Sequence, residues 1–321
     1  MTPSRPAPRG VRIEARAKLN LGLVVGARRA DGFHDLATVF QSVSLADTLI
    51  VTPRRRGFAL GVRYQDRSLP RSPDRLKRAR PSAGGQVPGG ADNLVLKAAR
   101  LLSDRYRLPG ARFTLIKRIP AGAGLGGGSA DAAAALSGLG RLYGLRWSRA
   151  EKLALAGELG SDVPFTWLGG TALGLGRGER LSPLRLARPF RALIAVPSWR
   201  VETGPAFRSL DRGKYGLTGR GRILRFVEAI GREAVTASQA ARLGNTFEKV
   251  LGRKGPQFRS LCARLRRAGA EEPHLTGSGS GVFAVVPAGL TAGRIVDRFV
   301  GDEAIYLIRS RAKGLTHYTL R

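Results

Sequence analysis

Two long segments near the start of the chain alternate between apolar and polar residues. Residues 11–25, with the sequence VRIEARAKLNLGLVV, and residues 36–53 both show this period of two, which predicts β-strands. The sequence between them, GARRADGFHD at 26–35, is rich in turn-forming residues and predicts a loop. A third alternating segment, ARFTLIKRI at 111–119, predicts another strand. The first part of the chain is therefore expected to form a β-sheet.

Helical patterns lie between and after these strands. The sequence LVLKAARLLSDRY follows Asp92 and Asn93, either of which can cap a helix. Ser129 opens the alanine-rich sequence SADAAAALSGLGRLYG, which favours helix by propensity. Ser148 is followed three residues later by Glu151, which is the pattern of a capping box and predicts the start of another helix.

Past Pro183 short strand patterns alternate with helical ones. Strand patterns cover 191–197, 281–287 and 304–310, and helical patterns cover 220–243, 256–268 and 291–300. This alternation predicts a smaller α+β lobe in which helices cover strands. Residues 54–92 differ from both parts because they are basic and rich in Pro and Gly, which predicts a loose hairpin or a partly disordered segment.

Composition narrows the class of protein. The 321 residues contain no run close to the roughly 18–20 apolar residues of a membrane span, so we expect no membrane association. The sequence from Met1 to Gly10 is rich in Pro and Arg and lacks the apolar stretch of a secretory signal. The single cysteine, Cys262, excludes an internal disulfide, and a reducing cytoplasm is the expected location.

The chain is strongly basic, with 55 Lys and Arg against 23 Asp and Glu and a formal charge of +32 at pH 7. Such a charge attracts polyanions, so nonspecific polyanion binding is expected. Arg greatly outnumbers Lys and the excess is spread along the chain, which favours a compositional bias together with anionic substrates over a nucleic-acid partner.

The most informative segment is glycine-rich and directly precedes a predicted helix. Ile119–Leu136 reads IPAGAGLGGGSADAAAAL, and five glycines lie within seven residues of it. Glycine lets the backbone approach a ligand, and the N–H groups at a helix start bind phosphate. We therefore expect an ATP-binding loop, and its residues are Pro120, Ala121, Gly122, Ala123, Gly124, Leu125, Gly126, Gly127, Gly128 and Ser129.

Two common phosphate motifs do not explain this loop. The sequence GxxxxGK[ST] is absent, because no Lys follows the glycines. A GxGxxG match exists at 122–127, but no acidic ribose partner is evident about 20 residues later. The Ser129 hydroxyl lies at the expected first helical turn, where it suits a phosphate oxygen or a Mg²⁺ ion that arrives with ATP.

Four blocks of sequence resemble the GHMP kinases. They are ARAKLNLGLVVGARRADGFHDLATVFQSVSLAD (15–47), the glycine loop, GSDVPFTWLGGTALGLGRGERL (160–181) and HLTGSGSGVFAVV (274–286). AKLNL followed by RADGFHDL is typical of one family within this superfamily, the 4-diphosphocytidyl-2-C-methyl-D-erythritol kinases of non-mevalonate isoprenoid precursor synthesis. The similarity covers about residues 11–52 and 92–310.

The resemblance implies a catalytic pair, Lys18 and Asp162. Lys18 would polarise the acceptor hydroxyl or steady the transferring phosphoryl group, and Asp162 would orient or deprotonate that hydroxyl. From the residues alone, Lys18 could instead extend to the surface and Asp162 could simply cap a helix. ATP and Mg²⁺ are the implied cofactors, with no direct protein cage for the metal, since Cys/His metal spacing is absent.

The resemblance also implies residues for a substrate in which cytidine diphosphate is linked to methylerythritol. Phe33 would stack on the base, and it replaces the Tyr that is frequent in the family. His34 would hydrogen-bond the base, and a glycine loop would close on the acceptor or its phosphates. The implied substrate-binding residues are Asn20, Phe33, His34, Thr203, Phe207, Gly277, Ser278 and Gly279.

The expected fold is α+β and two-lobed, like that of the GHMP kinases. Residues 1–182 would form the ATP-binding N-terminal domain, with 54–92 as a basic insertion, and 183–321 the smaller C-terminal α/β sandwich. The expected reaction is phosphorylation of the 2-hydroxyl of 4-diphosphocytidyl-2-C-methyl-D-erythritol. The alternatives are a GHMP kinase for mevalonate, homoserine or a sugar, and a basic RNA-associated protein on a related fold.

Overall fold

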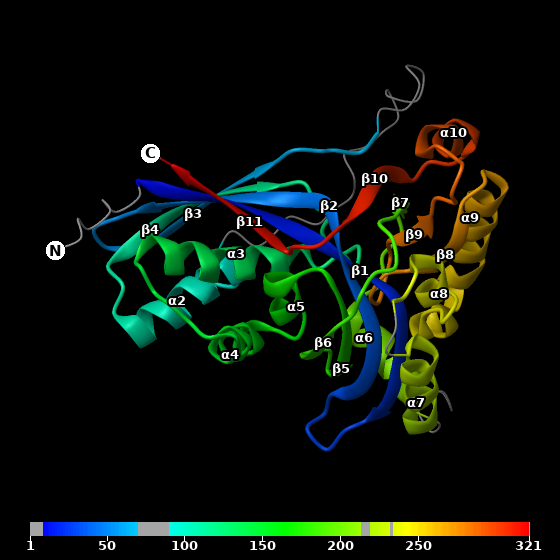
Figure 1. Ribbon diagram of the computed structural model, residues 1–321, viewed down its shortest axis with the longest axis horizontal. Helices are drawn as coiled ribbons and strands as arrows, with labels where there is room; N and C mark the ends of the chain where they lie inside the picture. The colour runs from blue at the N-terminus through cyan, green and yellow to red at the C-terminus, as the bar shows by residue number, and fades with distance from the viewer. Residues whose placement is uncertain (1–8, 70–89, 213–218, 232–233, 321) are drawn as a thin grey trace.

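One long antiparallel strand pair organises the computed structural model, which describes residues 9–69, 90–212, 219–231 and 234–320. β1 (Gly10–Arg28) and β2 (His34–Pro53) pair from Val11↔Val51 to Arg28↔His34 (Figure 1). The two predicted strands are thus confirmed, and both extend into the segment predicted as a loop. Pairing closes around the short turn at 29–33, where Arg29 N donates to the Phe33 carbonyl and Phe33 N donates to the Asp31 carboxylate.

β2 is the centre of an 11-stranded sheet in the described part of the chain. One edge of β2 pairs with β1, and the other edge pairs in turn with β5, β10 and β4. β7, β9 and β8 extend the sheet beyond β10. The remaining strands are β3 (Gly57–Tyr64), β4 (Gly110–Lys117), β5 (Thr171–Gly176), β6 (Arg180–Pro183), β7 (Arg191–Val196), β8 (Glu271–Leu275), β9 (Val282–Val285), β10 (Ala304–Arg311) and β11 (Leu315–Leu320).

The helices begin mostly where the sequence places caps. The Asn93 side chain accepts a hydrogen bond from the Val95 N–H at 2.8 Å, and Ser148 with Glu151 forms the predicted capping box. The helices are α2 (Leu94–Tyr106), α3 (Gly127–Leu142), α4 (Arg149–Leu159), α5 (Val163–Leu168), α6 (Thr203–Arg212), α7 (Gly219–Ile230), α8 (Ala237–Ala241), α9 (Gly255–Arg267) and α10 (Ala292–Arg298), with 3₁₀ turns η1 (Thr246–Val250) and η2 (Gly252–Lys254).

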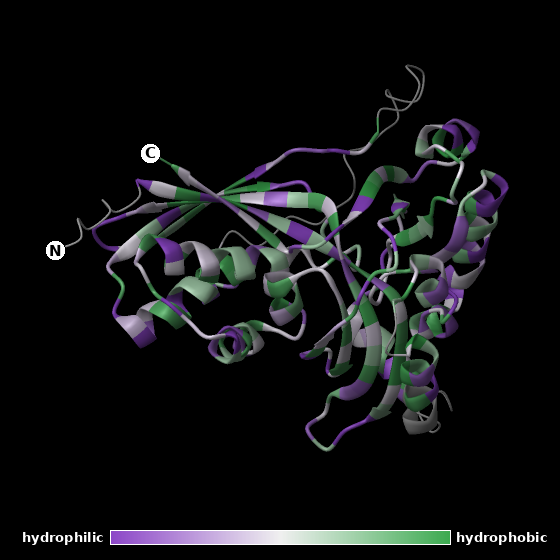
Figure 2. Ribbon diagram, in the orientation of Figure 1, coloured by the Kyte–Doolittle hydropathy of each residue, from purple (hydrophilic) through white to green (hydrophobic). Residues whose placement is uncertain are grey.

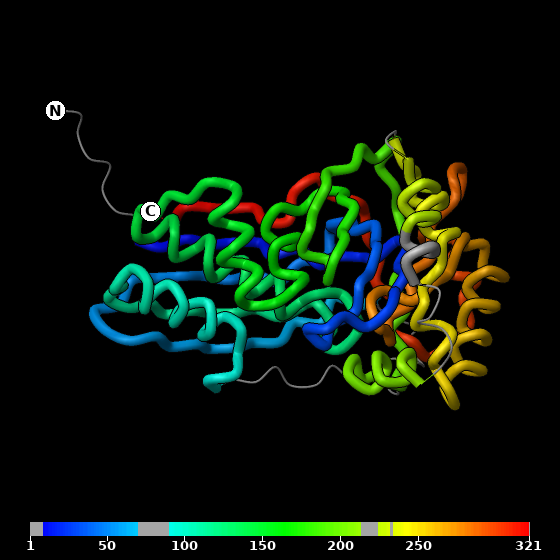
Figure 3. The backbone as a smooth tube through the Cα atoms, turned by 90° about the horizontal axis from the view of Figure 1, so that it is seen from below, coloured from blue at the N-terminus to red at the C-terminus, as the bar shows by residue number. Residues whose placement is uncertain are grey.

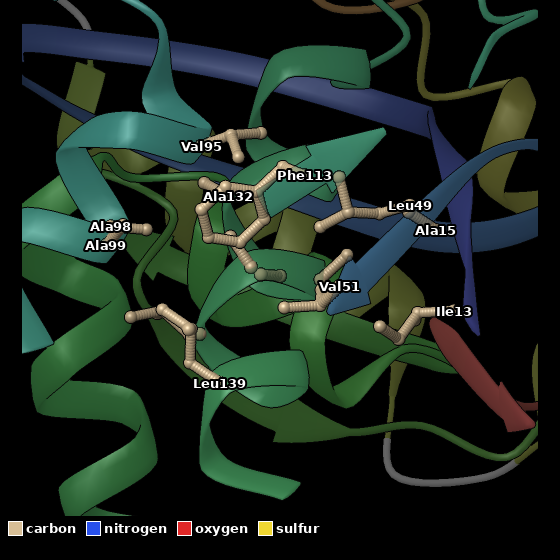
Figure 4. Packing of buried hydrophobic residues seen from close by; sticks show 14 of the residues in the cluster. Ile13, Ala15, Leu49, Val51, Val95, Ala98, Ala99, Phe113, Ala132 and Leu139 are labelled. Carbon is tan, nitrogen blue, oxygen red and sulfur yellow. The ribbon is translucent and has the colours of Figure 1, made fainter. Parts of the chain in front are cut away.

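The N-terminal core lies between the sheet and helices α2 to α5. Ile13, Leu49 and Phe113 from the strands face Val95 of α2 and Leu139 of α3 (Figure 4). The alanines of α3 are buried, and a Cβ at Gly138 would lie 2.7 Å from Val51 Cγ2. Small residues therefore let α3, which carries the end of the glycine loop, approach the sheet closely.

The second half packs a separate group of helices against β7, β8 and β9. Figures 1 and 3 show α7 to α10 at one end of the long axis and α2 to α4 at the other. Figure 2 shows that the outward side of α9 is largely hydrophilic, whereas its Phe258, Leu261 and Leu265 are buried. The two-lobed α+β prediction is confirmed. The division at 182/183 stays a prediction, and the last strand, β11, returns to pair with β1.

Two sequence predictions require correction. The stretch 54–92 is not wholly loose, because β3 pairs in parallel with β4 from Gly57↔Gly110 to Tyr64↔Lys117. The apolar side chains of β3 pack against the core, and the surrounding arginines obscure that pattern. Residues 70–89 lie outside the described residues.

The helix predicted at 220–243 is instead two helices, α7 and α8, which are separated after the left-handed Gly231.

Among the helices of the described ranges, none combines the length and apolar character needed to cross a bilayer.

Candidate active site

β1 is irregular where it passes the glycine-rich loops. Its register with β2 shifts between Arg16 and Lys18 and again between Asn20 and Gly22. Over this stretch the free edge of β1 bonds to loops, because Lys18 N donates to the Leu125 carbonyl at 3.0 Å and Asn20 N donates to Thr276 Oγ1 at 3.0 Å. Bulges re-aim side chains near functional sites. Here they flank Lys18 and Asn20, the two polar side chains in the otherwise apolar part of β1 from Ala17 to Val25.

Lys18 is the centre of a buried polar cluster. Its ammonium lies 2.6 Å from Asn20 Oδ1 and 3.3 Å from Asp162 Oδ2, and the residue is only 3% exposed. Asn20 in turn donates to Thr38 Oγ1 at 2.8 Å, and Thr38 donates to a backbone carbonyl. The alternative in which Lys18 extends to the surface is therefore wrong. A buried ammonium needs such partners, and they fix its position.

Asp162 occupies the N-cap position of α5 but does not act as a side-chain cap. Its carboxylate makes no capping hydrogen bond to the helix and points to Lys18 instead. The side chain remains 35% exposed. The carboxylate is thus held by one ion pair and stays open to the cavity described below.

Two glycine-rich loops meet beside Lys18. Gly122, Gly124 and Gly126 all have positive φ, and a Cβ at Gly124 would lie 2.0 Å from the Thr276 carbonyl oxygen. A Cβ at Gly126 would lie 2.9 Å from Lys18 Cγ. A side chain at Gly124 or Gly126 would displace the second loop or Lys18. Close contact between the loops therefore requires glycine here.

α3 begins at Gly127, two residues before the predicted start at Ser129. Gly126 at its N-cap provides no side-chain hydrogen bond, so the first N–H groups of the helix are available to an anion. A Cβ at Gly127 would face Ile119 and Lys117 rather than open space, which means that packing explains this glycine.

A cavity of about 370 Å³ unites these elements. The predicted catalytic and substrate residues line it, with the exception of Gly279; they are Lys18, Asn20, Phe33, His34, Asp162, Thr203, Phe207, Gly277 and Ser278. Three predicted ATP residues line it, and they are Gly124, Gly126 and Ser129. The other predicted loop residues do not, and they are Pro120, Ala121, Gly122, Ala123, Leu125, Gly127 and Gly128. Ala123 and Leu125 turn their side chains into the core.

Aromatic residues gather at one end of the cavity. The Phe207 ring stacks on His34 with centroids 4.9 Å apart, and Phe247 meets Phe207 edge-on at 5.0 Å. Phe33 is 49% exposed, and the Arg177 guanidinium lies 4.6 Å from its ring centroid. Aromatic rings of this kind suit the binding of a planar base.

Sequence reasoning missed several cavity residues. They are Leu23, Leu36, Thr38, Phe40, Ser161, Arg177 and Phe247. Arg177 lies within one of the four quoted blocks, but nothing local distinguishes it from the many other arginines. Asp211, which does not line the cavity, was also missed, although its Oδ1 lies 2.7 Å from His34 Nε2.

A buried charge network supports both ends of the glycine loop. The Lys117 ammonium bonds to Asp47 and, at 2.7 Å, to Asp131 in the first turns of α3. Burial disfavours the charged amine, but Asp131 and Asp47 outweigh it and raise the pKa of Lys117. Burial raises the pKa of Asp131 well above its ordinary value, against the attraction of Lys117. Because Asp47 also accepts from the Ile119 N–H at 2.9 Å, the network ties β4 to α3 across the loop.

The oxygen donors at the cavity fit a magnesium ion that is bound mainly by phosphates. Ser129 lies in the first turn of α3 and Asp162 is partly exposed, and both line the cavity. Within the described residues there is no group of three or more His, Cys, Asp or Glu that could hold a metal ion. Mg²⁺ usually takes one or two carboxylates and completes its shell with substrate phosphates and water.

Comparison with known proteins identifies relatives of this chain. Residues 93–170 match the GHMP kinases N terminal domain. The chain is 40% identical over 291 residues to 4-diphosphocytidyl-2-C-methyl-D-erythritol kinase of Moorella thermoacetica, a match that covers 89% of this chain and 93% of that protein. The same kinase of Streptomyces coelicolor is 37% identical, with 84% and 85% covered.

Solved structures agree with the sequence relatives. The crystal structure of a 4-(cytidine 5'-diphospho)-2C-methyl-D-erythritol kinase superposes with a TM-score of 0.70 at 32% identity and covers 93% of this chain and 98% of that chain. A homoserine kinase from Cytophaga hutchinsonii has a TM-score of 0.71 at 18% identity, with 98% and 99% covered. L. major mevalonate kinase has 0.66 at 15%, with 96% and 99% covered. The last two share the fold alone.

Proposed function

The chain belongs to the 4-diphosphocytidyl-2-C-methyl-D-erythritol kinases, a family of GHMP kinases, and on this premise we propose how its residues perform phosphoryl transfer. It is an ATP-dependent small-molecule kinase. The γ-phosphoryl group of ATP passes to the 2-hydroxyl of 4-diphosphocytidyl-2-C-methyl-D-erythritol, and ADP leaves. The observation that carries the assignment of roles is the contact between Lys18 and Asp162 at the wall of the cavity.

Asp162 acts on the acceptor. Its partly exposed carboxylate receives or orients the proton of the attacking hydroxyl, as a positioned base does in phosphoryl transfer. Lys18 lies beside it with its amine held by Asn20, so its positive charge offsets charge on the carboxylate and on the transferring group. The transfer relies on positioning and electrostatics, and these fixed groups need little reorganisation.

The phosphates of ATP bind at the glycine loop. The positive end of the α3 dipole lies at Gly126 and Ser129, which line the cavity, and Gly126 is also close to Lys18. Mg²⁺ bound with ATP would neutralise phosphate charge, and Ser129 is the residue that would hold it, since Asp162 is paired with Lys18 and acts on the acceptor. The part of the cavity between the glycine loop and the aromatic end is then left to the acceptor.

The cytidine end of the substrate binds among the aromatic side chains. Phe33 and Phe207 supply faces for stacking and His34 supplies hydrogen bonds, and all three line the cavity. Thr203 Oγ1 lies 2.8 Å from Ser278 Oγ, so α6 and the second glycine loop are joined on the same wall. This contact supports a role for both in closing on the substrate.

Asp162→Asn tests the proposed roles. The change keeps the shape and removes the charge, so we expect turnover to fall about 10²–10⁴-fold while ATP still binds. The change also removes the carboxylate partner of the buried Lys18 ammonium, so the melting temperature should fall as well, and turnover is therefore compared at a temperature at which both proteins are fully folded. Asp92→Asn is the matched control, since Asp92 also precedes a helix and lies 3.3 Å from a lysine, Lys97, but its side chain is 86% exposed and does not line the cavity.

Turnover, ATP affinity and melting temperature are measured on the same samples. A folded Asp162→Asn enzyme with normal turnover would remove this carboxylate from the mechanism.

The cytoplasmic location and nonspecific binding of polyanions stay predictions that rest on the single cysteine and on the charge of +32.

A further inference from the structure

One face of α6 makes two contacts with a single histidine. Phe207 and Asp211 are four residues apart, so their side chains lie on the same side of the helix. Phe207 stacks on the His34 ring at 4.9 Å with 29° between planes, while Asp211 Oδ1 lies 2.7 Å from His34 Nε2. The His34 side chain is 6% exposed and that of Asp211 is 32% exposed. The helix therefore fixes both the plane and the rotation of the imidazole.

The contact with Asp211 determines which ring nitrogen carries the proton. An ionised carboxylate only accepts hydrogen bonds, so Nε2 must be the donor. A neutral imidazole that is protonated at Nε2 has its lone pair at Nδ1. Nδ1 makes no hydrogen bond with any residue in the described ranges, and the ring lines the cavity. His34 therefore presents an acceptor to the ligand.

An acceptor at this position distinguishes two pyrimidine bases. Cytosine carries an exocyclic amino group, which donates hydrogen bonds, and uracil carries a carbonyl oxygen at the same place, which accepts them. With Nδ1 as acceptor, the amino group of cytosine can donate a hydrogen bond to it. The carbonyl oxygen of uracil cannot, because both atoms would then be acceptors. Leaving buried polar groups unpaired is the usual way in which a site rejects a close analogue.

We propose that Asp211 is a positioning residue that holds His34 in the Nε2–H form and thereby makes the site select cytidine over uridine in the diphosphate-linked substrate. The inference rests on the proposed function, because it requires the base to lie against His34. Asp211 does not line the cavity and need not touch substrate. Its effect is exerted through the ring that it orients.

Asp211→Asn tests the inference because an amide can either accept from Nε2–H or donate to a bare Nε2. The variant should therefore populate both forms of the ring. We expect the ratio of kcat/KM for the cytidine substrate over its uridine counterpart to fall about 10–100-fold. The loss should appear mainly as a higher KM for the cytidine substrate, with kcat largely kept, because Lys18 and Asp162 are unchanged.

The assay compares wild type, Asp211→Asn and Asp35→Asn at pH 8, above the ordinary titration range of histidine. Asp35 is the matched control, because it adjoins His34 in sequence but is 54% exposed and contacts Arg29 instead. ¹⁵N NMR of the imidazole reports the tautomer directly, and the loss of one signal in His34→Gln assigns it. Wild type and Asp35→Asn should show the Nε2–H form, and Asp211→Asn a mixture.

Two results would overturn the inference. One is an Asp211→Asn enzyme with an unchanged tautomer and unchanged discrimination. The other is an equal loss of kcat/KM for both substrates together with a lower melting temperature, which a purely structural role predicts. Failure of the proposed function looks different, since His34→Gln would then leave the KM of the cytidine substrate unchanged.

Discussion

At the scale of single residues, the ammonium of Lys18 shows how burial and function are linked. The group is buried, and only Asn20 and Asp162 among the described polar side chains lie within bonding distance of it. A buried charge that loses its partner is strongly destabilising, so the Asp162 carboxylate beside Lys18 also supports the fold. The same pair lines the cavity, so the arrangement that satisfies the charge also holds the two groups to which we assign catalysis in the proposed function.

A double-mutant cycle tests whether Lys18 and Asp162 act as a unit. Lys18→Met should depress turnover about as strongly as Asp162→Asn, roughly 10²–10⁴-fold. Adding the second change to the first should then reduce turnover little further, because groups that act together lose their joint effect once. The measurement is kcat for the four proteins under saturating substrates. A loss in the double mutant equal to the product of the single losses would indicate independent roles.

The resemblance identified the residues that the site brings together, but it did not identify their supporting partners. Lys18 and Asn20 stand out because they are polar within the otherwise apolar sequence from Ala17 to Val25. Asp211 and Arg177 carry no such local signal, since each is an ordinary charged residue whose role depends on what the fold places beside it. Partners of this kind require the tertiary structure.

At the scale of elements, the glycine loop is shaped by contacts as much as by backbone freedom. Gly126 and Gly144 both have φ of 69°, but only Gly126 has Lys18 in the way of a Cβ, and Gly144 has nothing within 4 Å. Comparing substitutions at these two glycines therefore separates the effect of backbone strain from that of displacing Lys18.

Gly126→Ala should lower both the melting temperature and turnover, and Gly144→Ala only the melting temperature. Each change places a Cβ in the left-handed region, which costs about 1–2 kcal/mol. Only the first also displaces Lys18. Thermal unfolding and kcat, measured on both variants, check this. If Gly144→Ala lost as much turnover as Gly126→Ala, the effect would be one of strain and not of contact with Lys18.

β11 is tied to α3 through a histidine with a lowered pKa. His317 Nε2 lies 2.8 Å from Ser137 Oγ, and burial, with a smaller contribution from Arg141, lowers the pKa of His317 to about 4. The unfolded chain takes up this proton near pH ~6.5 and the folded chain does so only near pH 4. Stability from this group is therefore fully present above pH ~6.5 and is lost as the pH falls toward 4.

His317→Gln should flatten this part of the pH dependence. Gln can still bond to Ser137 but does not titrate, so the melting temperature of wild type should fall more steeply than that of the variant between about pH 6.5 and pH 4. Thermal unfolding across that range makes the comparison, and parallel curves for the two proteins would contradict it. Carboxylates that titrate in the same range affect both proteins equally.

Helices and strands could be predicted where the hydrophobic pattern is long. They were harder to predict where charged residues interrupt the pattern or where the element is short. The twenty-residue β2 and the alanine-rich α3 follow directly from periodicity and propensity. β3 was obscured by flanking arginines, and α5, with six residues, is too short to show a helical period. The break between α7 and α8 has local signals, the left-handed Gly231 and the capping box of Thr236 and Gln239, which a single helical pattern over 220–243 does not take into account.

At the scale of the whole molecule, the site exists because distant segments meet along one edge of β1. That edge pairs with β11 at one end, and then bonds to the first glycine loop at Lys18 and to the second at Asn20. Asp162, from the start of α5, and α6 complete the cavity. The net charge of +32 follows directly from the composition. Which segments come together at the cavity depends on the topology of the fold.

The most direct test of the proposed reaction is ADP release by the purified protein with a panel of acceptors, combined with ³¹P NMR of the product. With 4-diphosphocytidyl-2-C-methyl-D-erythritol, ADP should appear in step with a new phosphate monoester at the 2-oxygen, and Asp162→Asn should abolish most of both signals. Mevalonate and homoserine should release little ADP, although kinases for them share this fold. Equal or faster turnover of mevalonate, or a phosphate at another position, would contradict the proposed reaction.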